Sequence, residues 1–176
     1  MEQKSKNVSA QSNEIRNQYV IQQIMKVTLN LLKEKELSSI SISQLCDVAQ
    51  VGRTSFYRNF EDKEAIVKRI IHEQFDDLNL LEKTNGADFN IYFSVLTSYI
   101  KEYKEFYLLL SERRLLELFL EVLLEINGPK EEDENAWAYT KSFLFYGTYG
   151  WLKEWISRGM QESGDDLTKL FKQVGK

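Results

Sequence analysis

The side chains best suited to chemistry in this chain gather within residues 41–64. Elsewhere we find no paired carboxylates of defined geometry, no metal-ligand spacing and no phosphate-binding loop. The segment is instead rich in guanidinium, hydroxyl and amide groups, which bind phosphates and the edges of bases in the DNA major groove. It therefore predicts DNA binding through ten candidates: Ser41, Ser43, Gln44, Arg53, Thr54, Ser55, Tyr57, Arg58, Asn59 and Lys63.

Two short helical patterns must position these side chains, and they meet at residues 51–52. The positions expected to face inward, three or four residues apart, are Leu45, Val48, Ala49, Phe56 and Phe60. The rest of the second pattern is then left exposed on a short rod that fits the major groove. The arrangement predicts a helix-turn-helix, with Ser41 as the N-cap of the first helix.

The candidates divide by the part of DNA that they suit. Contacts to the DNA backbone are expected from Ser41, Ser43, Gln44, Tyr57 and Lys63. Contacts to base edges are expected from Arg53, Thr54, Ser55 and Asn59, whereas Arg58 suits either.

The same residues resemble the DNA-binding domain of tetracycline-repressor-like (TetR-type) transcriptional regulators over residues 13–72. The match rests on Leu45-Cys46-x-x-Ala49-x-Val51 followed by Ser55-Phe56-Tyr57-x-x-Phe60-x-x-Lys63-Glu64. The resemblance implies an all-α homodimer that represses transcription from a near-palindromic double-stranded operator and releases it on binding a small effector. An activator, or a regulator controlled by a protein partner, remains an alternative.

Two positions depart from the family pattern. Glu36, after the first long helix, and Gln50, at the turn, stand where the family commonly has glycine. A left-handed backbone at a non-glycine residue costs about 1–2 kcal/mol, so we expect either a different local geometry or packing that offsets the cost. Gly52, where the family often has serine, offers compensating freedom.

Composition is that of an ordinary soluble protein, with 43% hydrophobic and 28% charged residues. Charge is uneven: residues 1–72 carry a net +3 and the remainder a net −7, which favours a DNA-facing end and an acidic far end. The first residues lack the apolar stretch of an export signal, and no apolar run approaches the roughly 20 residues of a membrane span. With a single cysteine, Cys46, the chain is expected to be cytoplasmic.

Apolar periodicity predicts about nine helices and no strand. We expect a flexible arm over residues 1–12 and a helix-turn-helix domain with a connecting helix over residues 13–83. A helical regulatory and dimerisation domain is expected over residues 84–176, after a break at residues 84–86. Among its helices, one is predicted over residues 135–157.

The second domain is rich in aromatic residues, and two roles are expected of it. A cavity for an apolar or aromatic effector is predicted among Tyr92, Tyr103, Tyr107 and Phe143. A two-fold interface is predicted from Gly147, Gly150, Trp151, Glu154, Leu167, Leu170, Phe171 and Val174. The alternative for the two glycines is a helix crossing within the chain. An all-α enzyme using the aromatic cavity is a distant alternative; we expect no enzyme, no cofactor and no bound metal.

Overall fold

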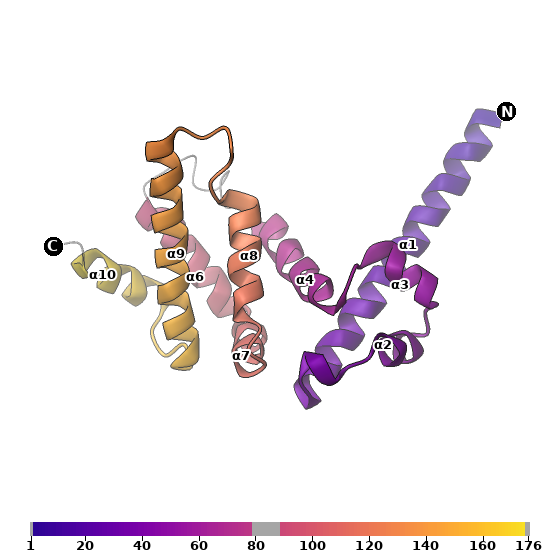
Figure 1. The fold of residues 1–176 in the computed structure, drawn as a ribbon, viewed down its shortest axis with the longest axis horizontal. Helices are drawn as coiled ribbons and strands as arrows, with labels where there is room; N and C mark the ends of the chain where they lie inside the picture. Colours follow the sequence, from indigo (N-terminus) through magenta and orange to yellow (C-terminus); the bar gives the residue numbers. More distant parts are fainter. Residues whose placement is uncertain (1, 79–88, 175–176) are drawn as a thin grey trace. The chain divides into compact units, whose positions relative to one another are not determined.

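The computed structural model describes the backbone of residues 2–78 and 89–174, and the side chains of residues 13–75, 91–170 and 173. Within these ranges the chain forms nine α-helices, one short 3-10 helix and no strand (Figure 1), so the predicted all-α class is confirmed. None of these helices combines the length and apolar composition that a membrane crossing requires. The chain divides into two compact units, Met1–Ile70 and Ile71–Lys176.

The first unit is built around a small core that fixes the helix-turn-helix. Its elements are α1 (Glu2–Glu34), η1 (Leu37–Ser39), α2 (Ile42–Ala49), α3 (Arg53–Asn59) and the start of α4 (Lys63–Leu78). Helix α1 packs against both α2 and α3. Fully buried side chains from all five elements or their flanks form the core: Ile24, Leu32, Ile40, Leu45, Phe56, Ile66 and Val67.

Helix α1 begins earlier than the sequence indicated, within the segment 1–12 for which a flexible arm is expected. The helix begins at Glu2 rather than near Asn13, and no glycine or proline interrupts it before Glu34. Apolar periodicity placed the start too late because residues 2–12 contain only two apolar residues, Val8 and Ala10. Further along the same helix, the apolar residues Ile15 and Tyr19 are 65% and 64% exposed.

The second unit holds the rest of α4 together with α6 (Phe89–Glu102), α7 (Lys104–Glu112), α8 (Leu116–Asn127), α9 (Asn135–Ser157) and α10 (Gly164–Val174). The helix predicted over residues 135–157 is confirmed as α9, which packs beside α7 and α8. Aromatic rings dominate the core, with the ring of Phe119 lying 5.4 Å from that of Tyr107 and 5.9 Å from that of Phe75.

The predicted domain boundary at residues 83/84, and the break at 84–86, lie outside the described residues. The division between the two units falls inside α4, which is continuous from Lys63 to Leu78. One helix therefore belongs to both units.

The C-terminal helix α10 is held on α6. The Lys101 ammonium of α6 donates to the backbone carbonyls of Met160 and Glu162, the latter at 3.1 Å, in the α9–α10 connection. At Gly164 a Cβ atom would lie 2.8 Å from the Ser98 hydroxyl oxygen, so glycine permits the close approach of the two helices. The position of α10 is thus set by α6 rather than by α9.

Candidate nucleic-acid interface

The first helix of the motif is anchored at its start by its own cap. The Ser41 backbone is extended, and its hydroxyl accepts a hydrogen bond of 3.1 Å from the Gln44 amide, which confirms the predicted N-cap. Leu45 and Ala49 face inward as predicted. Val48 does not, because it is 55% exposed, and the buried position is taken by Cys46 on the adjacent side of the helix.

The turn of the motif adopts a left-handed conformation at Gln50, with φ 54° and ψ 42°. The Gln50 amide donates to the Asp47 carbonyl at 3.3 Å, and the Val51 amide donates to the Cys46 carbonyl at 2.9 Å. These bonds satisfy carbonyls at the end of α2 and offset the cost of the left-handed residue. We expected either a different local geometry or local interactions that offset the cost of a left-handed residue. At Gln50 the structure shows the second outcome, through the two hydrogen bonds.

The two other unusual positions differ from Gln50. Glu36 is extended, with φ −64° and ψ 147°, so no left-handed residue is needed there and the local geometry differs. Gly52 also has an ordinary φ of −72°, and a Cβ atom would meet nothing within 4 Å. The backbone of Gly52 therefore adopts a conformation open to any residue, and the conformational freedom expected of this glycine is not needed.

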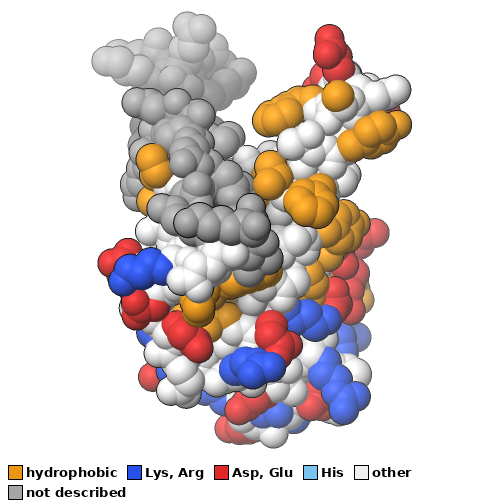
Figure 2. Space-filling model, turned by 90° about the vertical axis from the view of Figure 1, so that its left-hand side faces the viewer, with side chains coloured by type: hydrophobic (Ala, Val, Ile, Leu, Met, Phe, Trp, Pro, Cys, Tyr) orange, Lys and Arg blue, Asp and Glu red, His pale blue; other side chains and the backbone are white. Residues whose placement is uncertain are grey.

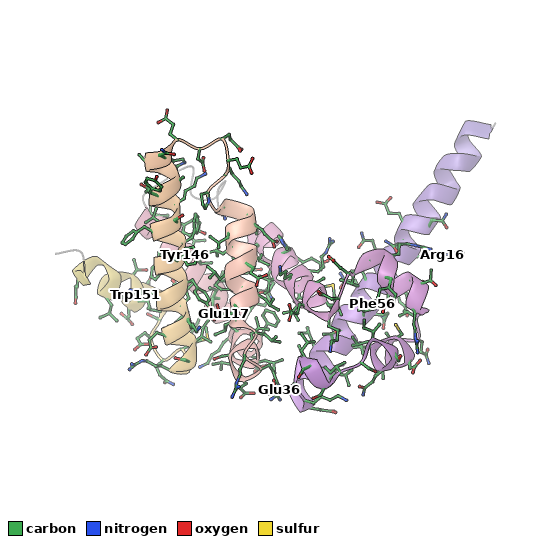
Figure 3. All side chains as sticks on the ribbon, in the orientation of Figure 1. Arg16, Glu36, Phe56, Glu117, Tyr146 and Trp151 are labelled. Carbon is green, nitrogen blue, oxygen red and sulfur yellow. The ribbon has the colours of Figure 1, made fainter. Side chains whose placement is uncertain are left out.

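The second helix, α3, presents a polar face because its aromatic face is buried. Phe56 and Phe60 are 0% and 4% exposed, and their ring centroids lie 5.9 Å apart; Phe56 points into the unit (Figure 3). Burying side chains of this size contributes about 1.5–3 kcal/mol each. The outer face carries Arg53, Thr54, Tyr57 and Arg58, all exposed, and Ser55 is half-buried.

Asn59 requires a correction, because its side chain is engaged inside the protein. Its amide nitrogen donates to the Asn17 side-chain oxygen at 3.0 Å and to the Ser55 carbonyl at 2.8 Å. The Asn17 amide nitrogen donates in return to the Asn59 oxygen at 2.9 Å. The predicted contact of Asn59 with a base edge is therefore not available in this arrangement.

Lys63 also differs from its predicted role at the DNA backbone. Its ammonium donates to the carbonyls of Leu37 and Ile40, both at 2.7 Å, and to that of Ser38 at 3.3 Å. The ammonium thus binds the carbonyl groups of η1 and of Ile40, the residue that follows it. Asp62 caps the start of α4, since its carboxylate accepts a hydrogen bond of 2.8 Å from the Ala65 amide. Lys63 therefore supports the fold of the unit.

The remaining candidates at the start of α2, Ser43 and Gln44, are half-buried. The Gln44 side-chain oxygen accepts a hydrogen bond of 3.0 Å from the ammonium of Lys35. Sequence reasoning missed Lys35, since only the fold brings the end of α1 next to α2. Lys35 adds a positive charge beside the predicted backbone contacts.

Cys46 is free and buried. Burial raises the pKa of its thiol, which keeps it protonated and unreactive. The single histidine, His72, pairs with Glu125 at 2.9 Å. Over the described part of the chain, no group of three or more His, Cys, Asp or Glu side chains is placed to hold a metal ion.

The four predicted effector residues are not brought together as one set. Tyr107 is fully buried and its hydroxyl donates to the Gln74 side-chain oxygen at 3.0 Å; Tyr92 is also buried, and burial raises the pKa of both phenols. Tyr103 is half-buried. Phe143 is 79% exposed on α9, so it does not line an enclosed space, because α9 packs through its opposite side.

The predicted interface residues lie on α9 and α10 around an open groove. The groove has a volume of about 340 Å³ and is lined by Gly150, Trp151, Glu154, Trp155, Arg158, Glu162, Leu167 and Leu170. A Cβ atom on Gly147 or Gly150 would meet nothing within 4 Å, so a crossing within the chain does not explain these glycines. The side chains of Phe171 and Val174 lie outside those that the structure describes.

Hydrophobic side chains extend along the upper part of this face in Figure 2, while charged side chains gather lower down. Tyr139, Phe143 and Tyr146 are 70%, 79% and 56% exposed on α9. Tyr139 and Tyr146 were missed as surface residues. Their spacing with Phe143, four and then three residues, is the sequence signal that would have identified one helix face.

Two family models of transcriptional regulators match the sequence of this chain. Residues 24–70 match the family model for bacterial regulatory proteins of the tetR family. Residues 87–176, more than half of the chain, match the model for a transcriptional regulator C-terminal region. The chain belongs to the tetR family. In this TetR-family regulator, α2 and α3 are therefore the helix-turn-helix of the family's DNA-binding domain, as the resemblance implied.

A solved TetR transcriptional regulator from Streptococcus agalactiae 2603V has a similar fold, with a TM-score of 0.63. The two sequences are 21% identical, and the match covers 94% of this chain and 98% of that chain. At this identity the likeness shows the fold over nearly the whole chain. Among curated proteins, none matches the sequence.

Proposed function

We propose that this TetR-family protein is a repressor that binds a near-palindromic operator as a homodimer and releases it when a small apolar or aromatic effector binds the second unit. The observation that carries the proposal is the outer face of α3. Arg53, Thr54, Tyr57 and Arg58 are all exposed there, on a helix whose opposite face is anchored by two buried phenylalanines. An exposed polar face of this kind supports the proposal that α3 reads the major groove.

A second copy is proposed because one helix-turn-helix carries little positive charge and α9 leaves apolar surface exposed. Residues 1–72 have a net charge of only +3, which supplies few phosphate contacts for one copy. The aromatic face of α9, defined by Tyr139, Phe143 and Tyr146, continues past the two open glycines into the groove beside α10. A contiguous face of this kind is typical of a protein interface.

Effector control is proposed through α4. The buried Tyr107 hydroxyl on α7 is bonded to Gln74 of α4, and α4 is one unbroken helix from Lys63 to Leu78. A ligand that displaces Tyr107 would break this link and bias the position of α4. Coupling of about 1–3 kcal/mol, typical of allostery, would lower operator affinity roughly 5- to 150-fold.

The DNA-binding proposal is tested by incubating the protein with a fragmented genomic DNA pool and sequencing the fragments retained in a mobility shift. We expect enrichment of an inverted repeat whose half-sites lie about 10 base pairs apart, centre to centre, or a multiple of that. The matched control is the double variant Arg53→Ala/Thr54→Ala, which should lose the enrichment while retaining its fold. A retained pool no different from the input would overturn the proposal.

Effector control is tested by a thermal-shift screen of apolar and aromatic compounds, with stabilising compounds retested for release of the operator. Tyr107→Phe is the control, because it keeps the ring and removes the bond to Gln74. Compounds should release the operator from the wild type and do so less effectively from the variant. Stabilising compounds that leave operator affinity unchanged would refute this part.

A further inference from the structure

The recognition helix α3 is tied to α1 by a closed pair of amide side chains. Asn17 and Asn59 exchange two hydrogen bonds of 2.9 and 3.0 Å across 42 residues of sequence. The second amide hydrogen of Asn59 is used by the Ser55 carbonyl at 2.8 Å. An asparagine side chain has two amide hydrogens, so both donors of Asn59 are taken within the protein.

The Asn17–Asn59 pair fixes the rotation of α3, which the buried phenylalanines alone do not fix. Phe56 and Phe60 hold the helix by burial, and apolar burial is non-directional. A helix of seven residues held only in this way is free to roll about its own axis by small amounts. Hydrogen bonds depend steeply on angle, so a two-way amide pair at the last residue of α3 fixes that rotation.

We propose that the Asn17–Asn59 pair positions the recognition helix, so that α1 contributes to sequence reading without touching DNA. The pair sets the rotation of α3 and thereby aims Arg53, Thr54, Tyr57 and Arg58 at the groove. This proposal rests on the proposed DNA-binding function. Asn59 is a positioning residue and not itself a base contact.

The test is a double-mutant cycle on the full-length protein, read out as specificity. Asn17→Ala, Asn59→Ala, the double variant and the wild type are each measured for affinity to the selected operator and to scrambled DNA of the same length. The exposed neighbour Gln18→Ala is the matched control, since it removes an amide from α1 outside the pair. Each protein is assayed well below its own melting temperature, with helical content checked by circular dichroism.

We expect both single variants to lower the ratio of operator to scrambled affinity by a similar factor, roughly 10-fold, with the double variant no worse than either. Affinity for scrambled DNA and its salt dependence should stay unchanged, because no charge is lost. Gln18→Ala should behave as the wild type.

Two results would overturn the proposal. In one, Asn59→Ala lowers the ratio while Asn17→Ala does not, which would make Asn59 a direct DNA contact. In the other, neither variant changes the ratio. If an alanine variant does not fold, Asn17→Ser and Asn59→Ser replace it under the same criteria. Failure of the wild type to prefer any sequence is a separate result that refutes the DNA-binding function, and this proposal with it.

Discussion

At the scale of single residues, Lys63 shows that the fold can engage a charged side chain in contacts that the local sequence does not indicate. A lysine at the start of α4, next to a predicted DNA-binding helix, suits a phosphate, yet its ammonium lies on the carbonyls of Leu37 and Ile40. A hydrogen bond to a charged donor contributes about 1.5–3 kcal/mol, and a buried carbonyl left without a partner costs a similar amount. In this structure the charge therefore stabilises the first unit.

We predict that Lys63→Met lowers the free energy of unfolding by about 2 kcal/mol. The salt dependence of DNA binding should not change, because no phosphate contact is removed. Urea unfolding and titrations at several salt concentrations measure the two quantities. Lys26→Met, at an exposed position of α1, is the control and should leave stability unchanged. A reduction of the salt slope by about one for Lys63→Met would restore its role as a phosphate contact.

Arg53 is the exposed residue best placed for a guanine, since it opens α3. Arg53→Lys keeps the charge but loses the two-pronged geometry of the guanidinium. We predict a loss of about 1–3 kcal/mol in discrimination between operator and scrambled DNA, with non-specific affinity unchanged. Competition binding measures both, with Arg16→Lys on α1 as the control. Equal losses on both DNAs would instead assign Arg53 to the backbone.

Residue types in the sequence were enough to locate the helix-turn-helix but not to foresee the contacts of every side chain within it. The exposed face of α3 followed from the burial of Phe56 and Phe60, because helical spacing fixes which residues lie opposite. Asn59 and Lys63 were misassigned because their partners lie 42 and 23–26 residues away. The type of a side chain indicates which groups it can bind, whereas the tertiary structure determines which of those groups lie within its reach.

At the scale of elements, caps and apolar spacing predicted the helix-turn-helix and the bounds of α9. Helix α9 begins and ends where the sequence placed it, and α3 begins directly after residues 51–52, where the two helical patterns were predicted to meet. The start of α1 was misplaced because residues 2–12 contain only two apolar residues, Val8 and Ala10, which are too few for a periodic signal. Phe143 was misplaced for the opposite reason: α9 carries aromatic residues on every side, so their spacing alone does not reveal which side is covered.

The turn between α2 and α3 yields a prediction at this scale. Gln50 is left-handed, a conformation that costs a non-glycine residue about 1–2 kcal/mol. Gln50→Gly should therefore raise the free energy of unfolding by about 1 kcal/mol, after the greater entropy of glycine in the unfolded chain is deducted. Gln18→Gly, inside α1, is the matched control and should lower it by about 1 kcal/mol. Denaturant unfolding that shows both variants destabilised would mean that the Gln50 side chain itself stabilises the turn.

At the scale of the whole molecule, the aromatic face of α9 exposes three large side chains, Tyr139, Phe143 and Tyr146, which we propose to be covered by a second copy. Phe143→Asp would place a charge in the proposed interface between two copies. An unpaired buried charge costs about 2–5 kcal/mol, so we predict that the dissociation constant of the dimer rises on the order of 30-fold or more. Sedimentation over a concentration series measures it, with exposed Gln161→Glu as the control. A wild-type protein that is monomeric at micromolar concentration would contradict the dimer.

We expect the attachment of α10 to α6 to determine when the proposed dimer surface becomes available as the chain folds. The Lys101 contact with Met160 closes a loop of 59 residues, whereas α8 and α9 are neighbours in sequence, and distant contacts form more slowly than local ones. Leu170 is presented beside Trp151 only after α10 has docked. We therefore expect two refolding phases in tryptophan fluorescence: an early one independent of protein concentration, then a concentration-dependent one in which folded monomers associate. A first phase that accelerates with protein concentration would mean instead that association guides the folding of the C-terminal helix.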